Sequence, residues 1–167
     1  MLAEHSWPGA ILHLDGDGFF ASCFESIYPE IKGKPIIVGK ERGMVIACSY
    51  AAKKYGIKRC ISIDQAMKLC PQCIAFDSDF KLYNLISQRM FSVLRQFTPV
   101  VEEYSIDEAF ADLKGLRRPL GMTYKEMGKK VKVQIENEIG ISVSIGISAT
   151  KSLAKLASNF RKPSGLT

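Results

Sequence analysis

Hydrophobic residues recur at intervals of three and four positions between residues 82 and 97, which is the spacing of one face of an α-helix. The pattern is carried by Leu82, Leu85, Ile86, Met90, Val93, Leu94 and Phe97. A second long helix with a charged outer face is predicted over 122–138. Thr150 opens a last helix, which is expected to turn four side chains toward the core: Leu153, Leu156, Ala157 and Phe160.

Shorter apolar runs predict β-strands. Residues 10–14 are expected to form a buried strand, and residues 141–147 alternate Ile and Val with Ser and Gly, as a strand does. Two further strands flank a tight turn at 104–108 and so form a hairpin. Residues 27–77 contain shorter strands and helices of their own, separated by Gly and Pro.

The order of these elements predicts the fold class. With residues 27–77 set aside, the chain runs strand, helix, strand, strand, helix, strand. This βαββαβ order is the ferredoxin-like plan. We therefore predict an α+β protein, with residues 27–77 as a small α/β domain inserted after the first helix. Ferredoxin-like folds host many activities, so the order of elements assigns no function.

Acidic residues stand at two of the predicted strand ends. Asp107 and Glu108 lie at the hairpin turn, and Asp15 and Asp17 follow the first strand. If these ends lie side by side, three or four carboxylates meet, and they repel one another unless they are protonated or bind cations. Oxygen ligands of this kind suit magnesium or manganese. For either stretch taken alone, a solvated acidic turn is the favoured interpretation.

The charge distribution points to a polyanionic partner. The formal net charge is +6, and residues 139–167 contain four lysine and arginine residues but no Asp or Glu. Residues 53–68 form a second basic stretch that is interrupted only by Asp64. Basic surface beside a metal-binding acidic cluster suggests a polyphosphate or a nucleic acid. Solubilising surface charge explains the composition alone equally well.

The cysteines, the histidines and residues 1–8 indicate no further catalytic or metal site. The five cysteines are scattered, and the pair Cys70 and Cys73 lacks a second pair that would complete a zinc site. We expect reduced structural thiols. His5 and His13 have no partner pattern, and His13 is expected to be structural. No apolar run approaches a membrane span, and residues 1–8 lack the blocks of a signal peptide, so a cytoplasmic protein is expected.

Four stretches carry recognisable motifs. They are Leu-Asp-Gly-Asp-Gly-Phe-Phe-Ala at 14–21, Ala-Cys-Ser-Tyr-Ala-Ala-Lys-Lys-Tyr-Gly at 47–56, Ser-Ile-Asp-Glu at 105–108 and Gly-Ile-Ser-Ala-Thr-Lys-Ser-Leu-Ala-Lys-Leu-Ala-Ser at 146–158. In this order they resemble the motifs of the Y-family, DinB-type translesion DNA polymerases. Lys-Pro-Ser-Gly at 162–165 is similar to a further stretch of that family.

The resemblance implies a domain organisation. It assigns residues 1–26 and 78–167 to a catalytic palm and residues 27–77 to the fingers. Members of the family continue into a thumb and a little finger, which grip DNA and are absent from this sequence. We therefore expect a catalytic-core fragment that binds primer–template weakly.

The resemblance also implies a metal site with two Mg²⁺ ions, for which Mn²⁺ can substitute. Asp15 and Asp107 would bridge the ions, and Glu108 would complete the ion that activates the primer 3′-hydroxyl. The backbone carbonyl of Gly16 would serve the ion on the nucleotide side. For Asp17 two roles are open, a helix cap and a metal ligand, and the cap is favoured.

Five further residues match nucleotide contacts of the family. Tyr50, Lys53 and Lys155 correspond to groups that contact the triphosphate. Phe20 matches the steric gate, a ring beneath the sugar that leaves no room for a 2′-hydroxyl and so favours dNTP over NTP. Phe19 is expected to support the floor beneath the nucleotide.

The function implied by the resemblance is metal-dependent, template-directed DNA synthesis past damaged bases, with mutagenic DNA repair and replication as its context. Primer–template DNA and dNTP are the expected partners of a monomer, and a sliding clamp would bind only through regions beyond this sequence. Two alternatives stay open. A nucleotidyl cyclase can use the same palm plan, although Phe20, Tyr50 and Lys155 argue against it. A non-catalytic repair scaffold would not need Asp15, Asp107 and Glu108.

Overall fold

The computed structural model describes residues 9–167, so the expectations for His5 and for a signal peptide at 1–8 lie outside the described residues. The chain divides into two compact units. Unit 1 comprises the described residues up to Asp17 together with Ile86–Thr167, and unit 2 comprises Gly18–Leu85. These limits differ in place from the predicted palm and fingers boundaries, and that division remains a prediction. Within the described residues no helix is long and apolar enough to cross a bilayer.

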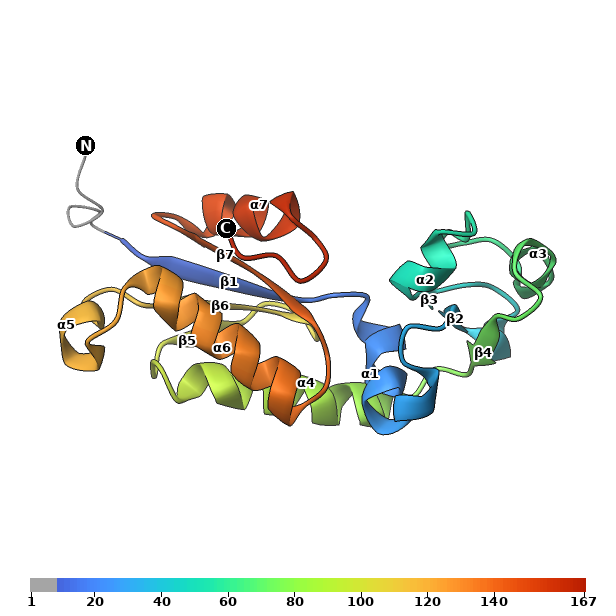
Figure 1. Ribbon diagram of the computed structural model, residues 1–167, viewed down its shortest axis with the longest axis horizontal. Helices are drawn as coiled ribbons and strands as arrows, with labels where there is room; N and C mark the ends of the chain where they lie inside the picture. Colours follow the sequence, from blue (N-terminus) through green and yellow to red (C-terminus); the bar gives the residue numbers. More distant parts are fainter. Residues whose placement is uncertain (1–8) are drawn as a thin grey trace. The chain divides into compact units, whose positions relative to one another are not determined.

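A four-stranded antiparallel sheet forms the centre of unit 1 (Figure 1). Its strands are β1 (Ile11–Gly16), β5 (Val101–Glu103), β6 (Glu108–Asp112) and β7 (Val143–Ser148). They lie in the order β5-β6-β1-β7, with the two strands of the hairpin side by side. The predicted α+β fold with its βαββαβ order is therefore confirmed, and β1, which carries Asp15, lies inside the sheet.

Two helices cover opposite faces of strand β7. A Cβ placed on Gly146 would meet the backbone of α7 (Lys151–Phe160), whereas one placed on Gly128 of α6 (Tyr124–Glu138) would meet the Ile147 side chain. Gly146 and Ile147 are neighbours in one strand, so they point to opposite faces of the sheet. Figure 1 shows α7 on one side of the sheet and α6 on the other.

The helix ends follow from local side-chain chemistry. Thr123 and Glu126 form a capping box at the start of α6, in which the Glu126 amide donates to the Thr123 hydroxyl at 3.2 Å and the Thr123 amide donates to the Glu126 carboxylate at 2.7 Å. The Thr150 hydroxyl accepts from the Leu153 amide at 3.3 Å and caps α7, as predicted. A short helix, α5 (Arg117–Leu120), was not predicted.

The predicted apolar face of α4 (Phe80–Arg95) is largely buried, whereas that of α7 is not. In α4 Leu85 is nevertheless exposed. In α7 the prediction is wrong, because Leu153, Leu156 and Phe160 are 51%, 68% and 75% exposed. The buried residues of α7 are instead Ala154 and Ser158. With no side chain at Gly146, the backbone of α7 lies directly on the sheet, and small residues fill that contact while the larger ones point outward.

Unit 2 contains a three-stranded sheet and short helices. The strands lie in the order β3-β2-β4, with β4 parallel to β2 and β3 antiparallel to it. The elements are α1 (Phe19–Ile27), β2 (Ile36–Val38), β3 (Ala47–Cys48), α2 (Tyr50–Lys53), α3 (Ile63–Leu69) and β4 (Ile74–Phe76), with 3₁₀ turns at Pro29–Ile31 and Lys40–Arg42. Residues of these elements enclose a hydrophobic core that includes Cys48, Cys70 and Cys73.

All five cysteines are free thiols, as predicted, and four of them are buried. Burial raises the pKa of the Cys73 thiol to about 12. A thiol with so high a pKa is a poor nucleophile at neutral pH, which agrees with a structural role.

We predict that Gly146→Ala destabilises the protein by roughly 2 kcal/mol or more, the range in which overpacking falls. The new methyl carbon would lie 2.1 Å from the carbonyl oxygen of Ala154 and 2.3 Å from the Ser158 nitrogen, and both atoms are backbone. The free energy of unfolding is measured by urea denaturation. Gly128→Ala is the matched control. Its methyl group would meet the side-chain ends of Ile147 and Leu166, and alanine has a higher helix propensity than glycine. Equal stability of the two variants would contradict this packing account.

Candidate functional site

The pairing of β1 with β6 brings the predicted catalytic carboxylates together. Asp15 lies directly opposite Glu108 in this antiparallel pair, so both side chains project from the same face of the sheet. Asp107 precedes Glu108 at the hairpin turn, and its carbonyl accepts a hydrogen bond from the Gly16 amide at 2.9 Å. All four predicted metal-binding residues therefore lie where β1 ends beside the start of β6.

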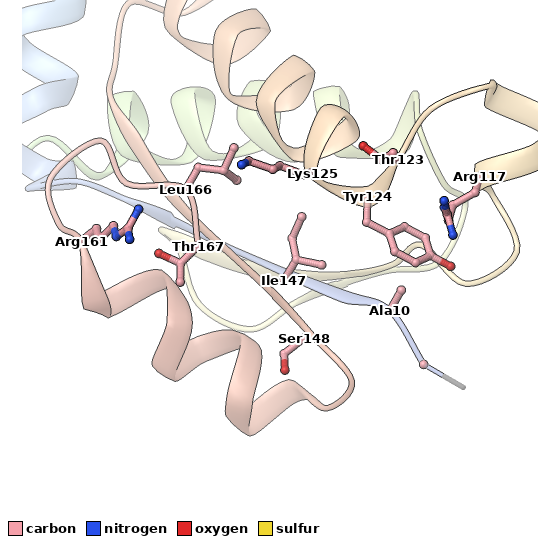
Figure 2. A pocket seen from close by; sticks show the side chains of 11 residues that line it. Ala10, Arg117, Thr123, Tyr124, Lys125, Ile147, Ser148, Arg161, Leu166 and Thr167 are labelled. Carbon is pink, nitrogen blue, oxygen red and sulfur yellow. The ribbon is translucent and has the colours of Figure 1, made fainter. Parts of the chain in front are cut away.

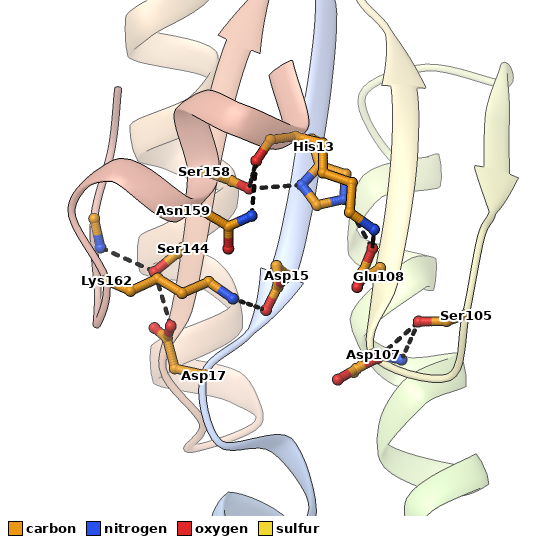
Figure 3. Close-up of polar contacts among 12 residues, drawn as sticks. His13, Asp15, Asp17, Ser105, Asp107, Glu108, Ser144, Ser158, Asn159 and Lys162 are labelled. Carbon is orange, nitrogen blue, oxygen red and sulfur yellow. Dashed lines mark hydrogen bonds and ion pairs between the residues drawn. The ribbon is translucent and has the colours of Figure 1, made fainter. Parts of the chain in front are cut away.

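Each of the two facing carboxylates is paired with a lysine (Figure 3). Lys162 Nζ lies 2.5 Å from Asp15 Oδ1, and Lys155 Nζ lies 2.5 Å from Glu108 Oε2. Asp107 instead accepts a hydrogen bond from the Ser105 hydroxyl at 2.7 Å. Two ammonium groups thus supply the positive charge that the adjacent carboxylates require.

Burial and neighbouring charges shift the pKa values of the two acids in opposite directions. Burial raises the pKa of Asp15, and the nearby Asp107 and Glu108 charges add to the rise, whereas Lys162 opposes it. Burial also works to raise the pKa of Glu108, but the hydrogen bonds and charges of Lys155 and His13 outweigh it and hold that pKa below its ordinary value. The hydrogen bond to Glu108 in turn raises the pKa of Lys155.

The donor set fits a divalent cation in its chemistry. Asp15, Asp107 and Glu108 lie at one end of the β1–β6 pair, and carboxylate oxygens are the ligands that Mg²⁺ and Mn²⁺ prefer. The Lys155 and Lys162 ammonium groups supply positive charge there. Among residues 9–167, however, no three acidic, His or Cys side chains are arranged so that they could hold a metal ion. Each lysine contacts one carboxylate oxygen, Oδ1 of Asp15 or Oε2 of Glu108, so these two oxygens become available to a cation only when Lys162 and Lys155 move.

The expectation that Asp17 caps the first helix is wrong. The N-cap of α1 is Gly18, and no side-chain hydrogen bond caps that helix. The Asp17 carboxylate, which is buried, accepts from the Ser144 hydroxyl at 2.8 Å and from the Ser164 amide at 2.7 Å. Asp17 therefore ties β7 to the segment after α7.

The contacts of His13 with Ser158 and Glu108 were not predicted from the sequence. His13 is fully buried on β1, and its ring lies between the Ser158 hydroxyl and the Glu108 carboxylate, at 2.8 and 3.3 Å. Burial lowers its pKa, although Glu108 opposes this shift. The available signal was the period of two in a strand, which places His13 and Asp15 on one face. Lys162 was expected only to contribute to the basic charge of 139–167 and to a family motif, and its contact with Asp15 was not predicted.

The predicted nucleotide contacts other than Lys155 belong to unit 2. The Phe20 ring is half-buried, with its centroid 4.5 Å from that of Tyr83, whereas Phe19 is buried. A Cβ on Gly18 would lie 3.7 Å from the Tyr50 ring, and Lys53 Nζ lies 4.2 Å from the centroid of that ring. Unit 2 thus holds Phe20 near Tyr83 and a lysine over Tyr50. Lys155, in unit 1, contacts Glu108 and lies 4.4 Å from the Tyr104 ring centroid.

A cavity of about 360 Å³ lies near the other end of β1 (Figure 2). Its lining includes Ala10, Tyr124 and Ile147, with basic side chains at Arg117 and Arg161. None of the predicted site residues is among the described residues that line it. This cavity is therefore separate from the carboxylates.

Comparison with known proteins places the chain in a family. The model of the impB/mucB/samB family matches residues 14–159. DNA polymerase IV of Clostridium perfringens (strain ATCC 13124) is 41% identical over 160 residues, which are 94% of this chain and 44% of the relative. DNA polymerase IV of Bacteroides fragilis (strain YCH46) is 38% identical over 158 residues, which are 93% and 43% of the two chains.

Solved structures agree with these sequence relatives. An insertion ternary complex of Dbh DNA polymerase matches with a TM-score of 0.84 and 30% identity, over 94% of this chain and 47% of that one. A Y-family polymerase chimera of Dbh and Dpo4 matches with a TM-score of 0.84 and 29% identity, over 95% and 48% of the two chains. The chain thus spans less than half the length of these relatives. It belongs to the impB/mucB/samB family, and its motif resemblance to Y-family DNA polymerases is confirmed.

Proposed function

We propose that this chain supplies the catalytic part of a lesion-bypass DNA polymerase, which adds a deoxynucleotide to a primer 3′ end and releases pyrophosphate. The observation that carries the proposal is the register that sets Asp15 opposite Glu108, beside Asp107, in a chain whose relatives are DNA polymerase IV proteins. The neighbour described as an insertion ternary complex supports DNA and dNTP as partners. The cyclase and scaffold alternatives gain no observation of their own. A cytoplasmic location, a monomeric state and a clamp contact remain predictions.

The carboxylates are proposed to hold the divalent cations, with Asp15 and Asp107 shared between two ions and Glu108 and the Gly16 carbonyl each serving one. Bound Mg²⁺ or Mn²⁺ would stabilise the charge that develops on the attacking and leaving oxygens. The contribution of the chain is to present oxygen donors from two paired strands, with little freedom in the backbone that carries them. Asp15 is 6% exposed, so its orientation is restricted by the packing around it.

Five residues are proposed to bind or position the nucleotide. Lys155, released from Glu108, and Lys53 would each offset negative charge on the triphosphate, and the Tyr50 hydroxyl would donate a hydrogen bond to it. Lys53 supplies a point charge rather than the two-pronged contact of an arginine. Phe20 would exclude the 2′-hydroxyl, because its ring is held by packing against Tyr83. Phe19 is buried, with its ring centroid 6.0 Å from that of Phe20, and would support the Phe20 ring.

We predict that replacing two ligands, Asp107→Asn together with Glu108→Gln, weakens Mn²⁺ binding by at least about tenfold, the scale on which losing even supporting groups of a metal site is felt. Binding is measured by the loss of the electron paramagnetic resonance signal of free Mn²⁺ during titration. Thermal unfolding checks that the variant folds, because the two substitutions alter the contacts of Glu108 with Lys155 and His13 and that of Asp107 with Ser105.

The matched control is Glu102→Gln together with Glu103→Gln, which changes the charge equally on the neighbouring strand β5. This control is expected to bind Mn²⁺ like the unmodified chain. Equal weakening in both double variants would show that net charge alone attracts the ion, and would contradict the assignment of Asp107 and Glu108.

We predict that Phe20→Ala reduces the preference for dNTP over NTP by at least about tenfold, the effect of removing an unfavourable contact of about 1.4 kcal/mol. Affinities are measured by displacement of a fluorescent nucleotide in the presence of Mn²⁺. Phe80→Ala is the control, because Phe80 also contacts the Tyr83 ring but is 52% exposed and was not predicted to touch nucleotide. An unchanged preference in Phe20→Ala would rule out the steric gate.

A further inference from the structure

His13 on β1 contacts Glu108 of β6 and Ser158 of α7 through its two ring nitrogens (Figure 3). Nδ1 lies 2.8 Å from the hydroxyl oxygen of Ser158, and Nε2 lies 3.3 Å from Glu108 Oε2. The ring is fully buried and packs against Phe110 with a centroid distance of 4.6 Å. An imidazole that is enclosed in this way cannot turn without breaking one of these contacts.

The groups beside the two ring nitrogens, the Ser158 hydroxyl and the Glu108 carboxylate, decide which nitrogen of His13 is the donor. A neutral imidazole donates from one nitrogen and accepts at the other, and a serine hydroxyl has a single proton to donate. The Ser158 hydroxyl lies 2.8 Å from the Lys155 carbonyl, so that proton can go either to this carbonyl or to His13 Nδ1. The Asn159 side-chain amide also donates to the Lys155 carbonyl, at 3.1 Å.

The Asn159 amide gives the Lys155 carbonyl a second donor, so this carbonyl keeps a hydrogen bond when the Ser158 hydroxyl donates to Nδ1 instead. Nδ1 then accepts, and Nε2 carries the ring proton toward Glu108. In the opposite tautomer a bare Nε2 would face a carboxylate oxygen, and two acceptors would repel each other without a shared proton. The hydrogen-bond geometry therefore favours one tautomer.

We propose that His13 is a positioning residue: held in its Nε2–H tautomer by Ser158, it donates to Glu108 Oε2 and orients this carboxylate for cation binding. The inference rests on the proposed function of Glu108 as a metal ligand. It goes beyond that function because it assigns a role to a buried histidine and to a serine of α7.

The geometry around Glu108 explains why a second donor is needed. Lys155 and His13 both contact Oε2, and among the described residues no hydrogen bond reaches Oε1. When Lys155 turns to a triphosphate, as proposed above, His13 is the contact that stays, because its ring is fully buried. Glu108 then keeps its orientation, with Oε1 directed away from the histidine. Supporting hydrogen bonds of this kind fix ligand geometry in metal sites.

The test compares two replacements of His13. Leucine fills the site but cannot donate, whereas glutamine keeps a side-chain N–H donor. We expect His13→Leu to weaken Mn²⁺ binding by about tenfold, the lower end for loss of a group that supports a ligand. His13→Gln is expected to stay within about threefold of the unmodified chain, by the same reasoning. Binding is followed by electron paramagnetic resonance, and thermal unfolding checks each variant.

Phe110→Leu is the packing control, because it disturbs the ring against which His13 packs and leaves both hydrogen bonds of His13 in place. It should bind Mn²⁺ like the unmodified chain. The proposal is overturned if His13→Leu binds Mn²⁺ normally, if His13→Gln loses as much affinity as His13→Leu, or if Phe110→Leu loses as much.

A second measurement needs no metal and so separates this inference from the proposed function. The ¹⁵N chemical shifts of the His13 ring report which nitrogen carries the proton, and the chain contains only one other histidine. We expect a protonated Nε2 and an unprotonated Nδ1 in the unmodified chain, with this preference lost in Ser158→Ala. A proton on Nδ1 alone would overturn the proposal. Absence of Mn²⁺ binding by the unmodified chain would instead overturn the metal site itself.

Discussion

The antiparallel pairing of β1 with β6 is the constraint on which the candidate site depends. Its register sets Asp15 opposite Glu108 and ties the backbone of Asp107 to Gly16. Like charges that face each other across two strands destabilise a sheet by about 0.2–1 kcal/mol, so this register requires compensating positive charge. Lys155 and Lys162 supply that charge in the structure, and both come from the segment that follows β7. In this structure lysine ammonium groups are thus the cations paired with Asp15 and Glu108.

The packing of α7 on the sheet positions Lys155 beside Glu108 and Ser158 beside His13. Gly146 has no side chain, so the backbone of α7 lies against β7 at Ala154 and Ser158. This close approach brings Ser158 within hydrogen-bond distance of His13 and places Lys155 beside Glu108. The exposed Leu153, Leu156 and Phe160 follow from the same geometry, since the side of α7 that meets the sheet admits only small residues.

Much of this could be predicted from sequence, because periodicity and motif order report on backbone geometry. The α+β class, the hairpin and the long helices follow from the spacing of apolar residues, and the family follows from four motifs in order. The inward face of α7 was predicted wrongly, because the rule that large apolar residues are buried fails where a glycine admits the helix backbone. Asp17 could not be placed, since its partners Ser144 and Ser164 are more than 120 residues away in the chain. The role of His13 likewise depends on Ser158, which lies 145 residues along the chain.

The central claim is that Asp15, Asp107 and Glu108 form a cation site from which Lys155 and Lys162 are displaced. Anomalous diffraction from crystals grown with Mn²⁺ and a dNTP tests it most directly, because the anomalous signal locates manganese without reference to the protein. The account predicts manganese bound by carboxylate oxygens of these three residues, with both lysine side chains moved away from Asp15 and Glu108. Manganese bound elsewhere, with both lysine–carboxylate pairs intact, would contradict it.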